Sequence, residues 1–146
     1  MFTATCCETT KRNRNVVGLF QEGDIITFQT FLVNTDDSFN LTSGLFNPIK
    51  DGYYSFSFVG LQTSAPNFSE TLRLAVYVNS IPMLKFQNFE AYENEFTGMD
   101  TISIAFNLKL QIGQAVALFI EQGQIICGQV ANCVFNGRYV RPLYYF

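Results

Sequence analysis

Three observations predict an all-β domain with the architecture of a sandwich or a barrel. Residues 26–58 alternate apolar and polar side chains and are interrupted twice by turn-forming residues, which is typical of three successive antiparallel strands. Similar period-two segments recur along the chain and bring the total to about ten predicted strands. No segment has the periodicity of an amphipathic helix.

Length and composition indicate one domain, residues 1–146, with more apolar surface than usual. A chain of this size buries roughly 70% of its unfolded surface, so its core requires neither a metal nor a disulfide. Charged residues make up 14% of the chain and aromatic residues 16%, whereas about 25% charged residues is typical. We therefore expect copies of the same chain to cover part of its surface.

Alternate residues of each predicted strand project to opposite faces, which separates core positions from outward ones. In the central segment the core set is Tyr54, Phe56 and Phe58, and the set facing water or a neighbour is Tyr53, Ser55 and Ser57. The later inward sets are Leu72, Leu74, Val76 and Val78, followed by Ile102, Ile104, Phe106, Leu108, Leu110 and Ile112. Residues 114–120 are apolar on both faces, which fits either an inner strand or a subunit contact.

Four glycine- and aromatic-containing motifs follow one another in a specific order. They are Phe2-Thr3-Ala4, Gly44-x-Phe46-x-Pro48-x-x-x-Gly52-x-Tyr54-x-Phe56, Leu108-x-Leu110-x-x-Gly113-x-x-Val116-x-Leu118 and Phe135-x-Gly137-x-x-Val140. Their order and spacing resemble the globular head of complement C1q, whose wider relatives are the tumour necrosis factor superfamily. The resemblance implies a two-sheet antiparallel jelly-roll sandwich that assembles as a homotrimer, with one sheet facing the threefold axis.

The residue inventory argues against catalysis. The chain has no histidine, which excludes histidine-dependent triads and the metal sites of cupins. Glu90, Glu93, Glu95 and Asp100 lie in a predicted loop, where solvated side chains are expected rather than a catalytic pair. We therefore expect a protein that is not an enzyme.

Charge and hydropathy limit the partners. The net charge is −3, and the only basic cluster, Lys11, Arg12 and Arg14, lies in a predicted loop, so no nucleic-acid partner is expected. No apolar run approaches the ~18 residues of a membrane span, and no signal segment follows Met1. We expect a soluble domain that acts outside the cell or on the surface of a particle.

Calcium is the one cofactor that the resemblance implies. Some members of that family hold calcium near the apex of the trimer through loop aspartates, and Asp36, Asp37 and Asp100 are the matching residues here. The chain lacks a dense Asp/Asn/Gly loop. It also has Gly113-Gln114 where the family often has Gly-Asp, so the evidence for calcium is weak.

The four cysteines are Cys6, Cys7, Cys127 and Cys133. In the jelly-roll order the first and last strands are neighbours, which favours a bridge from Cys6 or Cys7 to Cys133. A Cys127–Cys133 bridge and free buried cysteines are the alternatives. Zinc is disfavoured, because C-x-x-C spacing and histidine are both missing.

Loops at the ends of a rigid sandwich are the expected recognition sites, here residues 34–38, 62–70, 88–100 and 121–132. The candidate contacts to a protein or carbohydrate ligand are Asp36, Asp37, Asn67, Phe68, Tyr92, Asn94 and Glu121. Asn67 is also a candidate glycosylation site, whereas the second sequon, at Asn40, favours a turn.

An alternative function is a structural or attachment protein on a virion or spore surface, because no collagen stalk or heptad repeat is present. The aromatic tail, residues 141–146, then docks either on its own trimer or on such a partner.

Overall fold

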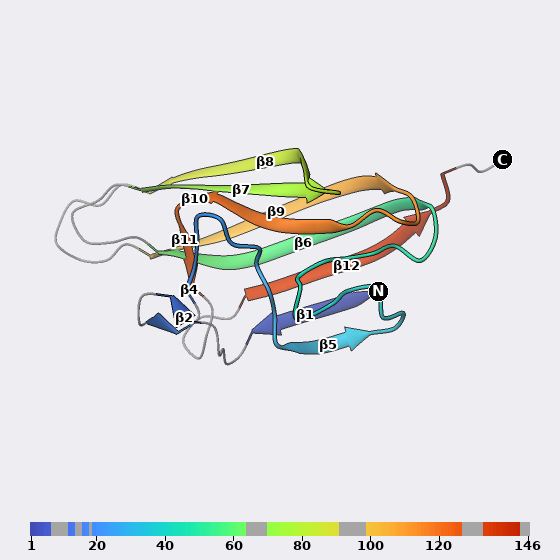
Figure 1. Ribbon diagram of the computed structural model, residues 1–146, viewed down its shortest axis with the longest axis horizontal. Helices are drawn as coiled ribbons and strands as arrows, with labels where there is room; N and C mark the ends of the chain where they lie inside the picture. The colour runs from blue at the N-terminus through green and yellow to red at the C-terminus, as the bar shows by residue number, and fades with distance from the viewer. Residues whose placement is uncertain are drawn as a thin grey trace.

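The computed structural model describes residues 1–6, 12–13, 16–17, 19–63, 70–90, 99–126 and 133–143. These residues contain twelve β-strands and no helix, and most strands belong to two antiparallel sheets that pack face to face (Figure 1). A separate short pair joins β2 (Arg12–Asn13) to β3 (Val16–Val17). The predicted all-β, two-sheet sandwich is confirmed.

The large sheet has seven strands. Its main path is β4 (Leu19–Gln21), β11 (Gln124–Ile126), β6 (Gly52–Thr63), β12 (Cys133–Arg141), β1 (Phe2–Cys6) and β5 (Thr30–Asn34). β9 (Met99–Leu110) pairs with the other edge of β6 along its whole length. The first and last strands of the chain, β1 and β12, are therefore neighbours, as the resemblance implied.

The small sheet has three strands in the order β10 (Val116–Gln122), β7 (Glu70–Val78) and β8 (Ile81–Glu90). Two single bridges, Ile25–Phe119 and Phe46–Val116, extend it beyond β10. Asn79 and Ser80 connect β7 to β8 with positive φ angles of 51° and 66°. Such angles are those of a two-residue hairpin turn, whose twist matches that of the strands.

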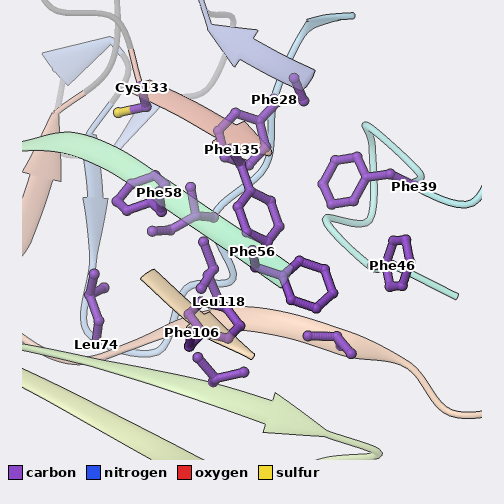
Figure 2. Close-up of a cluster of buried hydrophobic side chains, with 14 of the residues drawn as sticks. Phe28, Phe39, Phe46, Phe56, Phe58, Leu74, Phe106, Leu118, Cys133 and Phe135 are labelled. Carbon is purple, nitrogen blue, oxygen red and sulfur yellow. The ribbon is translucent and has the colours of Figure 1, made fainter. Parts of the chain in front are cut away.

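Aromatic rings fill the space between the sheets, and Phe135 on β12 lies at their centre (Figure 2). Its ring stacks on Phe28 and Phe56 at 5.9 Å and meets the edge of Phe2 at 5.3 Å. Gly137, on the same face of β12, makes room for these rings, because a Cβ atom there would lie 2.9 Å from Cε1 of Phe56.

The period-two core predictions are confirmed with one exception. Tyr54, Phe56 and Phe58 are buried, and the inward residues of β7 and most of those of β9 are buried as well. Ile112 was predicted to follow them but is 65% exposed, because β9 ends at Leu110 and the chain turns toward β10. The backbone N–H of Ile112 instead donates to Oδ1 of Asp51 at 2.8 Å.

The doubly apolar segment 114–120 forms most of β10. Val116, Leu118 and Ile120 enter the core, while Ala117 and Phe119 lie on the outward face. Ala117 is nevertheless buried and Phe119 half-buried, because neighbouring side chains of the same chain cover them. None of the described residues belongs to a helix that could cross a membrane.

Candidate recognition surfaces

Asp36 lies in the turn that follows β5, and both oxygens of its carboxylate accept hydrogen bonds. The Met1 amino group donates to its Oδ2 at 3.0 Å, and the Ser38 hydroxyl donates to its Oδ1 at 2.6 Å. Burial alone would raise the pKa of Asp36, but the hydrogen bond from Ser38 and the Met1 ammonium outweigh it and lower that pKa. The carboxylate is thus ionised and stabilises the turn itself.

Asp37 adopts a positive φ of 55° and exchanges two hydrogen bonds with Asn34. Asp100 lies far from both aspartates along the sheet. When the strand register is followed from β5 across β1, β12 and β6 to β9, Asn34 lies at the same level along the strands as Phe106. Asp100 precedes Phe106 by about six residues, or about 20 Å at ~3.3 Å per residue. The three aspartates therefore do not share one ion.

The described residues contain no group of three or more acidic or cysteine side chains that could hold a metal. Calcium accordingly remains a prediction. Asn67, Phe68, Tyr92 and Asn94 fall outside the part of the chain that the structure describes, as do Glu93 and Glu95. Asn40 is described, and its Oδ1 accepts from the N–H of Ser43 at 2.9 Å, which confirms its predicted role in a turn.

Cys133 is fully buried at the start of β12 and lies directly opposite Cys6 of β1 in the strand register. It is a disulfide-bonded residue of the structure. The side chain of Cys6 and the whole of Cys7 and Cys127 lie outside the described residues, so the identity of its partner remains a prediction.

Glu121 belongs to β10 and not to a loop, because the pairing of β10 with β7 continues to Gln122. Its side chain lies on the outward face of the small sheet, where Oε2 accepts from the Tyr77 hydroxyl at 3.1 Å. The Lys85 ammonium lies 3.4 Å from Oε1, close enough for an ion pair but without hydrogen-bond geometry. Partial burial and then the bond to Glu121 raise the pKa of Tyr77.

The outward face of the large sheet carries a polar row that the sequence patterns did not single out. Thr3 Oγ1 donates to Oδ1 of Asn136 at 2.7 Å, and Asn136 Nδ2 donates to the hydroxyl of Ser57 at 3.1 Å. Beside this row is a hollow of about 330 Å³ that Arg138 also lines. Farther along the same face, Val59 is 38% exposed and pairs with the half-buried Val134.

A second feature lies between the sheets, where the edge strands β8 and β9 leave an opening of about 380 Å³. Gln62, which is completely buried, accepts a hydrogen bond from Asn88 Nδ2 at 2.6 Å at this level of the sandwich. The bond joins β6 of the large sheet to β8 of the small sheet and satisfies polar atoms that would otherwise destabilise the core.

Comparison with known proteins agrees with this architecture. The C1q domain family matches residues 8–140. Among solved structures, the globular domain of zebrafish complement 1qA protein superposes with a TM-score of 0.66 and covers 97% of each chain at 20% identity. No curated protein matches the sequence. The family match spans most of the chain, and the chain therefore belongs to the C1q domain family.

Proposed function

We propose that the chain is a non-catalytic, trimeric recognition module that binds a protein or carbohydrate ligand through loops at the ends of the sandwich. The family match over residues 8–140 carries this proposal. C1q domains are generally non-catalytic, typically form trimers that bind ligands, and are typically extracellular.

The interactions that Asp36 and Glu121 make within the chain support a non-catalytic role. Asp36 and Glu121 each hold a hydrogen bond and a cation of the same chain, and they lie on different elements. A chain without histidine would need other acids and bases brought together in one cleft. Asp36 and Glu121 stabilise the fold instead.

The outward face of the large sheet supports trimer formation. Val59, Val134 and Leu61 form an apolar cluster on the neighbouring strands β6 and β12 of this face. A second copy would remove these side chains from water, which favours association at roughly 25 cal/mol per Å². Three copies about one axis would place the end loops of all subunits in one assembly and would add avidity.

Light scattering with and without a calcium chelator tests the assembly. We expect a trimer, and loss of the trimer on chelation would show that calcium is part of it. A strict monomer in both conditions would contradict the proposal. Binding is then tested by capturing candidate ligands from extracellular fluid with the intact trimer and with an Asp37→Ala variant of the end loop.

The alternative, a structural role on a particle surface, makes a different prediction. It requires the chain to co-purify with particles and to capture no soluble ligand, so the same capture experiment separates the two functions.

A further inference from the structure

The outward face of the small sheet has a hollow of about 130 Å³, which we call the alanine hollow. Its floor is formed by the small side chains of Ala115 and Ala117. The remaining lining residues are Ile25, Leu45, Tyr77, Asn79, Ser80 and Phe119. These residues come from four parts of the chain that are distant in sequence, and together they build one site.

The aromatic wall of the alanine hollow is held in position by its neighbours. The Tyr77 and Phe119 rings lie 4.8 Å apart with an interplanar angle of 39°. The hydroxyl of Tyr77 is anchored by Glu121, which Lys85 approaches from β8. Side chains fixed in this way lose little conformational freedom when a ligand binds, which favours affinity.

Polar groups converge on the other end of the hollow. The N–H of Asn79 donates to the carbonyl of Ala115 at 2.9 Å, and Oδ1 of Asn79 accepts from the N–H of Ala115 at 2.8 Å. This double contact orients the Asn79 amide. Among the described residues, neither its Nδ2 nor the Ser80 hydroxyl has a protein partner, so both can bind a ligand.

The lining restricts the class of ligand. The bridges Ile25–Phe119 and Phe46–Val116 occupy backbone groups beside the floor, which disfavours addition of a peptide strand. The described lining includes no charged side chain, which disfavours an anionic or cationic group. The volume is below the ~300–1,000 Å³ of sites for drug-sized ligands, so one ring is the expected occupant.

We propose that the alanine hollow binds the terminal neutral hexose of a glycan. One apolar face of the pyranose packs on Tyr77 and Phe119, and its hydroxyls bond to Asn79 Nδ2 and Ser80 Oγ. The inference rests on the proposed recognition function but moves its site from the end loops to a sheet face. Each hollow binds weakly, and a trimer presents three of them to a multivalent glycan.

The test is a titration of the ¹⁵N-labelled chain with the methyl glycosides of glucose, galactose and mannose, followed by two-dimensional NMR. We expect at least one sugar to shift the Asn79 side-chain amide and the Ala117 amide saturably, with a millimolar Kd. Ala117→Val should weaken that affinity by about tenfold or more, because the larger side chain fills the floor while valine still suits a strand.

Two further variants distinguish a loss of binding at the hollow from a general disturbance of the fold. Asn79→Asp keeps an oxygen to accept from Ala115 but removes the Nδ2 donors, and it should also weaken binding. Gln87→Val, at an exposed position of β8 outside the hollow, should bind like the parent chain. The inference is overturned if no sugar shifts these amides, or if Ala117→Val binds equally well. A trimer that captures a ligand through its end loops would still support the proposed function in either case.

Discussion

The outward faces of the two sheets are built from different kinds of side chain, although both inward faces are apolar. On the large sheet, hydroxyl and amide groups such as Thr3, Ser57 and Asn136 form a hydrogen-bonded row beside a hollow, and an apolar cluster around Val59 lies farther along. On the small sheet, Tyr77 and Phe119 stand over an alanine floor.

Both faces are hollowed, but their side chains suit different partners. An extended face with exposed apolar side chains can bury enough area to hold copies of a chain together, whereas a small concave site suits a single ring. Under the two proposals above, the large sheet would hold the copies together and the small sheet would bind the glycan. The predictions below test that division of roles.

The largest effect is expected in the shared interior. Phe135→Ala should lower the free energy of unfolding by about 3–5 kcal/mol, because it removes a ring that contacts at least Phe2, Phe28 and Phe56. Urea denaturation measures the change. Val140→Ala, at an exposed position of the same strand, is the matched control. Equal losses for the two variants would contradict the assigned inward position of Phe135.

Val59→Lys should disrupt the trimer more than any outward change on the small sheet. Burying an unpaired ammonium at a subunit contact should raise the dissociation constant by about a hundredfold, or ~2.7 kcal/mol. Light scattering over a concentration series measures it. Ile81→Lys, at an exposed site beside the β7–β8 turn, should leave the trimer intact. If Ile81→Lys disrupted the trimer and Val59→Lys did not, the small sheet and not the large sheet would carry the subunit contact.

Gly137→Ala should destabilise the large sheet by about 1–3 kcal/mol, because the added methyl group meets the Phe2 and Phe56 rings. Thermal unfolding monitored by circular dichroism is a sufficient measurement. Ser55→Ala, on the outward face of β6, should change stability little. If Gly137→Ala left the stability unchanged, the rings would move aside with little loss of free energy.

Glu121→Gln should lower the pKa of Tyr77 toward its ordinary value, because the carboxylate is one cause of its elevation. NMR of the ring carbons as the pH is raised above 10 measures this directly. The fold should lose about 1 kcal/mol or less. Glu22→Gln provides a control carboxylate outside the cluster, and an unchanged Tyr77 pKa in Glu121→Gln would show that burial alone raises it.

The smallest effect on stability is expected from a substitution of Asp36, and it should appear only at acidic pH. Its pKa is lowered in the folded chain, so its contribution is complete above the ordinary value of 3.8 and is lost as the pH falls below it. Asp36→Asn should therefore flatten the decline in stability below about pH 4, by under about 1 kcal/mol for a partly solvated pair. Denaturant midpoints across that range measure it, and an unchanged slope would contradict it.

Strand periodicity predicted the interior well, because a buried face and a solvated face alternate residue by residue. Tyr54, Phe56 and Phe58 followed from that rule alone. Gln62 obeys the same alternation, but a polar residue was not expected to be buried. Its burial became clear only from the fold, which brings Asn88 of the other sheet within hydrogen-bond distance. Glu121 was placed in a loop, because sequence gave no sign that β10 continues to Gln122.

The candidate ligand site was harder to predict, since it has no local pattern. The doubly apolar segment 114–120 was a partial signal, and its two interpretations were an inner strand or a subunit contact. The structure adds a third, because Ala115 and Ala117 become the floor of a hollow only when the Ile25 and Tyr77 segments lie on either side. Small residues show such a role only after the chain has folded.

The pairing of β1 with β12 also determines when this chain can fold during synthesis. Because β12 lies between β1 and β6, the interior of the large sheet is completed only after β12 has left the ribosome. Until then β1 and β6 expose unpaired edges and aromatic faces to other nascent chains. With contacts this distant in sequence, slow folding that begins only after β12 has been synthesised is expected.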